Sequence, residues 1–453
     1  MKVISILVRG GSDASAVKAT CDRFFQGIIS EVVNVGGRGS KFWEKVLDEV
    51  HSNRNKYFMV LVGRRDFDEE YFKLIDSLPN VTTCLIPKAN VRNATLGELM
   101  KYIGICKSKF RLALGIKNSL LLPKVSEDEV VNKDLINPAY DNFLIINEGI
   151  RIIEKLTNRE VLGDAILAFR EFAGLHTMFG FNGYELLRMR FSEESLRPKV
   201  EYVANDRLLR GIDLINTIIK SSNVLNIYEG ISINFIRELS KEFDEVVVPW
   251  SGGKDSTATL LITMKALGKH GVDVVYVDTG VEFHYTKEYI EEVAKLLGID
   301  YKVLRAPIRE ELLKGKELPT HDNRWCTYLK RLAIANYIRS RFRGRKVLVV
   351  IGDRDAESIS RSRKGFVESD RDITNAVNAY PIKLWGGTHV QLYLMSRGIN
   401  LCKLYNLGFY RVGCYICPSL RSWEIFIILN TEIGKSLINN PLWSKFLKSR
   451  KGT

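Results

Sequence analysis

The sequence predicts an α/β protein with more than one domain. Short apolar runs typical of buried strands alternate with amphipathic helical patterns near both ends of the chain, which favours parallel sheets with crossover helices. The length of 453 residues exceeds what one core normally supports, and 45% apolar residues suffice to bury several. Two glycine turns, at residues 10–15 and 251–256, each follow a predicted strand and lead into a predicted helix.

The charge balance favours an anionic partner. The chain has 67 Lys and Arg against 53 Asp and Glu, a formal net charge of +14. Such an excess suits nucleic acid, a phosphorylated small molecule or an acidic surface, and a heat-stable surface rich in Lys and Glu explains it equally well. No apolar run approaches the roughly 20 residues that cross a bilayer, and no leading segment resembles a signal peptide. We therefore expect a cytoplasmic protein without a membrane partner.

Three regions follow from the order of these patterns. Residues 1–120 form a predicted N-terminal α/β domain, with strands over 3–8, 57–63, 82–87 and 111–116 and helices over 13–28 and 68–78. Residues 121–243 form a predicted linker and helical middle region, since helical periodicity dominates there. Residues 244–453 return to alternation, with strands predicted over 245–250, 272–280, 301–307 and 346–353.

The glycine turn after Trp250 carries the strongest chemical signal. Its residues, Ser251 to Ser256 ("SGGKDS"), would lie at the carboxyl end of a strand, where open α/β sheets bind ligands. Gly252 and Gly253 permit a close approach of backbone to ligand, and Lys254 adds a positive charge to the start of a helix. An ordinary strand-to-helix turn explains the glycines but not the whole string.

That string resembles the PP-loop of the ATP pyrophosphatases, also called the adenine nucleotide α-hydrolase-like group, and lacks the spacing of a Walker loop. The resemblance implies that Ser251, Gly252, Gly253, Lys254, Asp255 and Ser256 bind the phosphates of ATP–Mg²⁺ or of an adenylyl nucleotide. The N-terminal turn "RGGSDAS" lacks the leading serine and the lysine. We expect it to be dispensable for nucleotide binding.

Later segments resemble one branch of that group, the phosphoadenosine phosphosulfate (PAPS) reductases. "VDTGVEF" resembles their D-T-G segment, and the final block at 380–418 has their P-I-x-x-W, L-Y-x-x-G-x-x-R and G-C-x-x-C patterns. "GDRDAESISR" resembles their G-x-R-x-x-E-S-x-x-R. The resemblance covers about residues 244–420. It implies nucleotide-binding roles for Asp278, Thr279, Gly352, Arg354, Glu357, Ser358 and Arg361. The alternative for Asp278 is a helix cap, and the alternative for the arginines is a solvated basic loop.

Three cysteines align with the family's metal-binding positions. Cys326, Cys414 and Cys417 match, whereas family members with a [4Fe–4S] cluster have two adjacent cysteines at the first position. The resemblance implies a cluster, with Cys402 as the possible fourth ligand. Zinc with His321 and plain reduced cysteines are the alternatives. Cys21, Cys84 and Cys106 lie singly among apolar residues and are expected in the core.

The resemblance implies sulfur chemistry on an adenine nucleotide. Sulfonucleotide reductases use a cysteine after the C-x-x-C, and Pro418–Thr453 contain none. We therefore expect an ATP-dependent enzyme that adenylates a substrate, releases pyrophosphate and supports sulfur transfer. Lys254, Arg354 and Arg361 would neutralise phosphate charge, and Asp255 would contact metal or water. A sulfonucleotide reductase and a non-catalytic nucleotide-binding protein are the alternatives.

The acceptor and the sulfur donor are less defined. Residues 324–364 hold 12 Lys and Arg against 3 Asp and Glu, which suits tRNA or another nucleic acid. The same run also suits the solvated face of a helix. A sulfur donor protein is a further possible partner implied by the resemblance.

Overall fold

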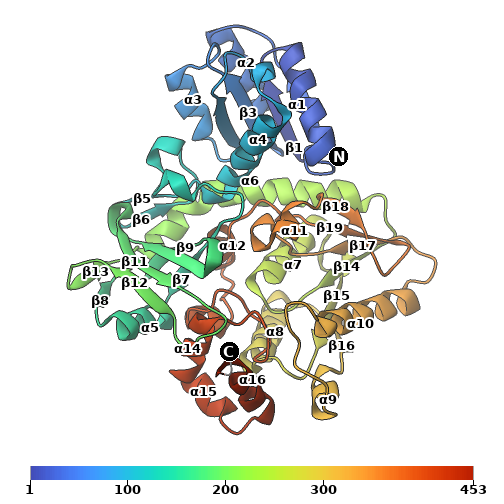
Figure 1. The fold of residues 1–453 in the computed structure, drawn as a ribbon. Coiled ribbons are helices and arrows are strands. Elements are labelled where there is room, and N and C mark those ends of the chain that lie inside the picture. The colour runs from blue at the N-terminus through green and yellow to red at the C-terminus, as the bar shows by residue number, and fades with distance from the viewer. Residues whose placement is uncertain (1, 452–453) are drawn as a thin grey trace.

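The computed structural model describes residues 2–451 and confirms the α/β class. At the N-terminus, four parallel strands are ordered β2-β1-β3-β4 and covered by helices (Figure 1). Both faces of β3 are buried, which explains its unbroken apolar run. The elements are β1 (Ile4–Val8), α1 (Gly11–Phe24), β2 (Glu31–Asn34), α2 (Ser40–Ser52), β3 (Tyr57–Gly63), α3 (Glu69–Asp76), β4 (Val81–Ile86), η1 (Val91–Asn93) and α4 (Leu96–Leu112).

The prediction of a strand over 111–116 is wrong for the first half of that segment. A capping box between Thr95 and Glu98 starts α4, and the helix continues to Leu112 because its last turns are buried. Only the end of the predicted strand pairs, in the hairpin of β5 (Gly115–Lys117) and β6 (Leu120–Leu122).

The middle region is mainly β-sheet, so its predicted helical character is wrong for most of residues 141–210. Five antiparallel strands are ordered β12-β11-β10-β9-β7. The elements are η2 (Glu127–Glu129), η3 (Lys133–Leu135), β7 (Asp141–Ile146), α5 (Glu148–Thr157), β8 (Glu160–Leu162), β9 (Ala165–Arg170), η4 (Phe172–Gly174), β10 (Leu175–Phe179), η5 (Phe181–Gly183), β11 (Glu185–Arg190), β12 (Lys199–Val203), β13 (Leu208–Arg210) and α6 (Leu214–Ser240).

The misreading has a physical cause. Apolar runs of five or six residues do not separate a strand from a buried helix by periodicity alone. The informative signals were the turns, where Ala173 and Asn182 adopt φ of 49° and 53° and each precedes a glycine with positive φ. These reversals join β9 to β10 and β10 to β11.

The third region has a six-stranded sheet ordered β16-β15-β14-β17-β19-β18, parallel except for β18. Strand order therefore reverses between β14 and β17. The elements are β14 (Glu245–Pro249), α7 (Lys254–Leu267), η6 (Lys269–Gly271), β15 (Asp273–Asp278), α8 (His284–Leu297), β16 (Lys302–Arg305), α9 (Ile308–Leu313), α10 (Trp325–Arg341), β17 (Val347–Val350), η7 (Asp355–Glu357), α11 (Ile359–Ser362), β18 (Val367–Ser369), β19 (Ala376–Ala379), α12 (Gly387–Ser396), α13 (Lys403–Asn406), α14 (Ser422–Leu429), α15 (Glu432–Leu437) and α16 (Pro441–Lys451).

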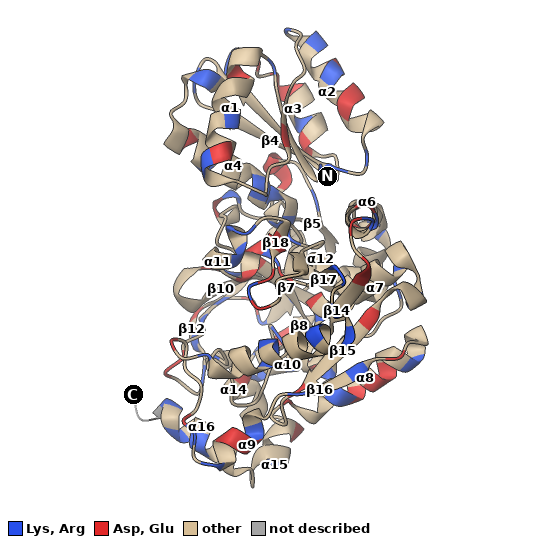
Figure 2. Ribbon diagram, turned by 90° about the vertical axis from the view of Figure 1, so that its right-hand side faces the viewer, with Lys and Arg blue, Asp and Glu red and all other residues tan. Residues whose placement is uncertain are grey.

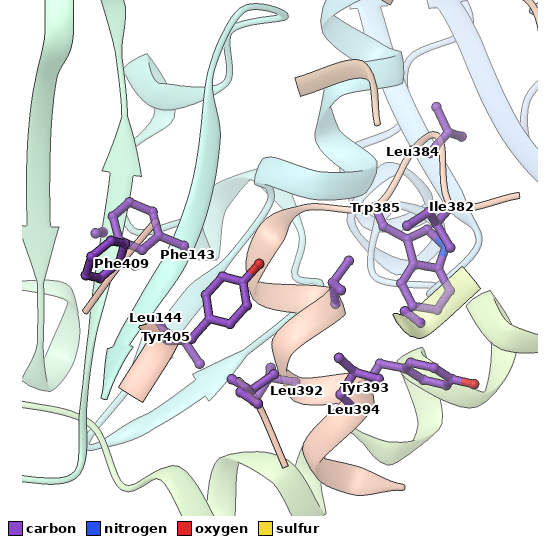
Figure 3. Close-up of a cluster of buried hydrophobic side chains, with 14 of the residues drawn as sticks. Phe143, Leu144, Ile382, Leu384, Trp385, Leu392, Tyr393, Leu394, Tyr405 and Phe409 are labelled. Atoms are coloured by element: carbon purple, nitrogen blue, oxygen red, sulfur yellow. The ribbon is translucent and has the colours of Figure 1, made fainter. Parts of the chain in front are cut away.

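One buried core joins all three regions. Helix α12 packs so closely on β7 that a Cβ atom added to Gly387 would lie 2.3 Å from the carbonyl oxygen of Asn142. Figure 3 shows Phe143 and Leu144 of β7 close to Tyr405 and Phe409 of the C-terminal segment. The antiparallel sheet lies beside the six-stranded sheet, and α12 packs between β7 and α7 (Figure 1). Within residues 2–451, no helix combines the length and apolarity that crossing a membrane requires.

Candidate functional site

The glycine turn lies where the strand order of the six-stranded sheet reverses, the usual ligand position in open α/β sheets. Gly252 adopts φ of 71°, a conformation that side chains other than glycine disfavour. The Ser256 hydroxyl stabilises the turn, since its oxygen accepts from the Ser251 N–H at 3.2 Å and its hydrogen is donated to the Gly253 carbonyl at 3.0 Å. The turn then leads directly into α7.

Lys254 is held in place by aromatic and acidic neighbours. Only 2% of its surface is exposed, and its ammonium lies 2.9 Å from Asp255 Oδ2. The rings of Tyr405 and Tyr410 lie 5.3 and 5.7 Å from that ammonium. The backbone N–H of Lys254 donates to the Tyr405 hydroxyl at 3.0 Å. The Lys254 ammonium therefore lies in a fixed position at the N-terminus of α7.

Arg354 connects this turn to the rest of the molecule. Its Nε lies 2.6 Å from Asp255 Oδ1, and its two terminal nitrogens bind the Asp141 carboxylate at 3.1 and 3.0 Å. Burial alone would raise the pKa of Asp255, but Arg354 and Lys254 hold that pKa below its usual range. Gly352 is needed here, because a Cβ atom would lie 2.8 Å from the Asp255 backbone.

Gly352 and Arg354 belong to the segment at 352–361, which we call the arginine motif. Its other residues fix the conformation of the loop around Arg354. Glu357 Oε2 accepts from the Arg354 N–H at 3.0 Å, and Ser358 Oγ accepts from the Arg361 N–H at 3.2 Å. Arg361 pairs with Glu357 and lies 3.3 Å from Asp353. The motif therefore folds into a compact turn against the PP-loop.

A strongly basic cavity of about 370 Å³ is lined by Lys254, Asp255, Arg354, Glu357, Ser358 and Arg361, whereas Ser251, Gly252, Gly253, Ser256 and Gly352 do not line it. Seven cations and three carboxylates face it, so the lining has an excess of positive charge. The antiparallel sheet supplies part of the wall. Among the carboxyls, Glu424 is buried, and burial raises its pKa. The charged lining residues are Arg170, Lys254, Arg324, Arg354, Arg361, Arg411, Arg421, Asp255, Glu357 and Glu424.

Asp278 and Thr279 lie at the same sheet edge but face a separate cavity of about 190 Å³. Asp278 accepts from the Gly280 N–H at 2.9 Å and lies 2.7 Å from Lys287, so it caps a turn. The Thr279 hydroxyl donates to Glu282. The structure therefore does not bring these two residues to the basic cavity.

Comparison with known proteins identifies this part of the chain. Residues 245–420 match the family model of the phosphoadenosine phosphosulfate reductase domain. These residues are similar to that domain, and we call them the PAPS reductase-like domain. The resemblance found in the sequence is thereby confirmed, and the matched range includes the PP-loop at 251–256, the segment at 352–361 and the C-x-x-C at 414–417.

Relatives extend beyond that domain. An uncharacterised protein of Methanocaldococcus jannaschii is 30% identical over 336 residues, 73% of this chain and 64% of its own length. An adenosine 5'-phosphosulfate reductase of Rhodococcus erythropolis is 26% identical over 163 residues, 35% of this chain and 64% of its own length. This chain therefore spans less than two thirds of either relative.

Solved structures resemble the chain at low identity. A phosphoadenylyl-sulfate reductase of Candida auris is 16% identical and covers 44% of this chain and 97% of its own, with a TM-score of 0.35. A Candida glabrata FMN adenylyltransferase in complex with ATP is 17% identical and covers 44% of this chain and 67% of its own, with a TM-score of 0.33.

The structure does not confirm a metal site at the cysteines of the PAPS reductase-like domain within residues 2–451. No group of three or more His, Cys, Asp or Glu side chains is placed there to hold a metal ion. Cys402 is buried 3.6 Å from the Tyr285 carbonyl, and His321 lies 3.1 Å from the Pro418 carbonyl. Neither a [4Fe–4S] cluster nor zinc is therefore confirmed.

The thiols instead contact basic side chains. Lys330 lies one helical turn after Cys326 on α10, and its ammonium is 3.9 Å from Cys414 Sγ. Arg411 lies 3.3 Å from Cys417 Sγ. Cys21, Cys84 and Cys106 are buried, as expected of core side chains.

The basic segment at 324–364 is largely neutralised by acidic partners. Arg331 lies 2.8 Å from Asp372, and Arg341 lies 2.9 Å from Asp273. Figure 2 shows Lys and Arg interspersed with Asp and Glu over this face. Much of the positive charge of this segment is therefore compensated by ion pairs.

Sequence reasoning missed Arg324, Arg411, Arg421 and Glu424 of the cavity lining. It also missed Asp141, Arg170 and His176, which lie outside residues 245–420, on strands of a region expected to be helical. Tyr405 was part of the matched L-Y-x-x-G-x-x-R segment, which offered a signal for it, whereas the strand residues had none.

Proposed function

We propose that this protein is a cytoplasmic enzyme of sulfur metabolism that binds ATP–Mg²⁺ and adenylates a substrate with release of pyrophosphate. One observation carries the proposal. Lys254, Asp255 and Arg354 form a buried, connected charge group at the reversal of strand order, facing a cavity with excess positive charge. Such a site suits the phosphates of a nucleotide.

The nucleotide would lie along the sheet edge. Its phosphates would contact the turn of Ser251–Ser256 and the N-terminus of α7, where backbone N–H groups and Lys254 favour negative charge. The adenine ring would enter an adjoining cavity of about 160 Å³. Apolar side chains of Val275, Val277 and Ile334 line that cavity and suit a planar base.

In the reaction, an acceptor oxygen forms a bond to the α-phosphorus while the bond from that phosphorus to the bridging oxygen of pyrophosphate breaks. Pyrophosphate leaves with the electron pair. Lys254 and Arg354 are positioned to offset the developing charge. Mg²⁺ needs only one or two carboxylates besides phosphate oxygens and water, so Asp255 alone fits as its protein ligand. Bound there, Mg²⁺ would neutralise phosphate charge.

Transfer of sulfur to the activated substrate, with a sulfur donor protein as partner, rests on the family resemblance. A tRNA or other nucleic acid as acceptor has less support, because acidic residues pair with much of the 324–364 segment. The cavity next to Lys254 instead suits a small molecule.

A sulfonucleotide reductase is the second candidate, since an adenosine 5'-phosphosulfate reductase is among the relatives. Residues 418–453 contain no cysteine, the residue that the resemblance would require after the C-x-x-C for this reaction. Sulfite release from adenylyl sulfate or PAPS, with thioredoxin as reductant, tests this reading. We expect no sustained release, and release that depends on one of the seven cysteines would favour the reductase.

Calorimetric titration with ATP–Mg²⁺ tests the leading proposal. We expect Lys254→Ala and Asp255→Ala each to weaken nucleotide binding or turnover more than tenfold, above about 1.4 kcal/mol. Lys269→Ala, at an exposed lysine after α7, is the matched control and should bind normally. Unchanged affinity and turnover in both loop variants would refute the nucleotide site.

A further inference from the structure

The wall of the basic cavity that faces the PP-loop carries guanidinium groups without carboxylate partners. Among the described residues, Arg170, Arg324 and Arg411 form no ion pair, and Arg421 has only a 3.8 Å contact with Glu193. The cations on the PP-loop side are each paired with a carboxylate. The unpaired charge is therefore concentrated on the wall away from the nucleotide.

The antiparallel sheet builds part of this wall. Asp141 on β7 pairs in register with Arg170 on β9, and Arg170 pairs with His176 on β10. Residues directly opposite each other on antiparallel strands present their side chains to the same face. Since Asp141 binds Arg354, this face of the sheet points at the nucleotide site.

Arg170 is held rigidly but keeps an unused donor. Its terminal nitrogen donates to the Ala356 carbonyl, and its guanidinium lies 5.5 Å from the Tyr410 ring centroid. Its Nε is buried and has no hydrogen-bond partner within the described residues. A buried charged donor left unpaired is costly, which points to a ligand that completes it.

His176 adds a neutral acceptor beside these donors. Its ring stacks on Phe191 at 3.7 Å and its Nδ1 lies 2.8 Å from the Gly174 carbonyl. A carbonyl only accepts, so Nδ1 carries the hydrogen and Nε2 keeps its lone pair. The ring lines the same cavity as Lys254.

From this geometry we propose that Arg170, Arg324, Arg411 and Arg421 form a second oxyanion subsite, which binds the small acid that receives the adenylyl group. The inference rests on the proposed function and names its substrate class as a carboxylate, sulfate or phosphate compound. Planar guanidinium groups bind such oxyanions with paired hydrogen bonds. The acid's oxyanion would lie opposite the PP-loop, near the α-phosphate.

The size and access of the cavity favour a small ligand. Its volume of about 370 Å³ lies at the lower end of small-molecule sites. A second cavity of about 750 Å³ adjoins it, and Arg170, Phe191, Ser358 and Arg421 line both. The acid would enter through this outer cavity while the nucleotide occupies the sheet edge.

Equilibrium dialysis with radiolabelled inorganic sulfate tests the subsite. The protein is first saturated with Mg²⁺ and the β,γ-imido analogue of ATP, which fills the nucleotide site. We expect one sulfate per chain, and at least about tenfold weaker sulfate binding in Arg170→Gln and in Arg421→Gln. Both variants should still bind the analogue. Arg421 is half-exposed, so its substitution is compatible with folding even if Arg170→Gln proves unstable.

Arg343→Gln, at an exposed arginine without an ion pair in the described chain, is the matched control and should bind sulfate normally. The subsite is refuted if analogue-saturated protein binds no sulfate, or if Arg421→Gln binds it as tightly as the control. A different result is that the protein does not bind the analogue but still binds sulfate, and loses that sulfate binding in Arg421→Gln. This result would refute the nucleotide assignment and support the subsite. The two proposals therefore fail separately.

Discussion

Asp141 and Arg354 form a two-bond ion pair between regions 213 residues apart in the sequence. Both side chains are almost fully buried, at 0% and 1% exposure. Arg354 also binds Asp255, so a chain of charges runs from the antiparallel sheet through the arginine motif to the PP-loop. The middle region is therefore part of the site, and it is more than a linker to the nucleotide-binding domain.

The first prediction concerns this pair. Asp141→Asn keeps the side-chain shape but removes its charge, which leaves Arg354 partly uncompensated in a buried position. Breaking a buried pair in this way costs about 3–5 kcal/mol. We expect a large loss of unfolding free energy in urea and weaker ATP binding. Asp206→Asn, at an exposed loop aspartate, is the control. Wild-type stability in Asp141→Asn would contradict the role of the pair.

The second prediction concerns Gly352. A methyl group there would lie 2.8 Å from the Asp255 backbone and push the arginine motif away from the PP-loop. We expect Gly352→Ala to fold but to lose most nucleotide affinity in calorimetric titration. Gly97→Ala is the matched control, because nothing lies within 4 Å of its added methyl. Equal affinity in both variants would show that the close approach is unnecessary.

How much of this site the sequence alone predicts depends on where its residues lie. Lys254 and Asp255 fall within the glycine turn that a strand–turn–helix pattern locates, and Arg354 falls within the segment that resembles the G-x-R-x-x-E-S-x-x-R of the PAPS reductases. Arg170 and His176 are single polar residues at strand ends, and only sheet register brings them to the cavity. Long-range register depends on packing of the whole core, which no local pattern encodes. The helical misreading of 141–210 concealed it further.

The third prediction concerns acid stability. Burial lowers the pKa of His176 to about 3 and that of His389 to about 4, against about 6.5 in an unfolded chain. Both rings are neutral in the folded protein, so the unfolded state binds more protons once the pH falls below 6.5. Stability is therefore full above that pH and is lost as pH falls toward the folded pKa values. Each histidine contributes about 1.4 kcal/mol per pH unit in that window.

Urea unfolding between pH 7 and pH 4.5 measures this slope. His389 lies 2.9 Å from the Pro123 carbonyl and is fully buried. We expect His389→Gln to be less stable than the wild type but to show a shallower pH slope, by about one proton. An unchanged slope would contradict the neutral, buried state of His389.

The fourth prediction concerns the N-terminal glycine turn. Asp13 is fully buried there, and its Oδ1 accepts from the Arg92 N–H at 2.9 Å, which ties α1 to η1. Since no lysine follows its glycines, we expect this turn to have a structural role and to bind no phosphate. We expect Asp13→Ala to lower the melting temperature while ATP affinity stays at the wild-type value. Loss of ATP binding in a folded Asp13→Ala protein would relocate the nucleotide site.

The last prediction concerns Lys107, through which the N-terminal domain reaches the site. Its ammonium extends from α4 to within 2.8 Å of Asp355 Oδ2 and 3.2 Å of the Ser362 carbonyl. Lys383 lies 2.5 Å from the other oxygen of Asp355, and all three groups are buried. Asp355 directly follows Arg354, so this cluster holds the arginine motif from behind.

Lys107→Met keeps the length of the side chain and removes its charge. Burial would raise the pKa of Asp355, and Lys107 with Lys383 brings it below its usual range. Without Lys107 that carboxylate loses half its compensation, so we expect the loop to shift and ATP affinity to fall several-fold along with stability. Lys101→Met, at an exposed position of the same helix, controls for loss of a lysine. If Lys107→Met lowers stability but binds ATP like the control, α4 supports the fold alone. Weaker ATP binding measured well below the melting temperature would establish that the N-terminal domain positions the arginine motif.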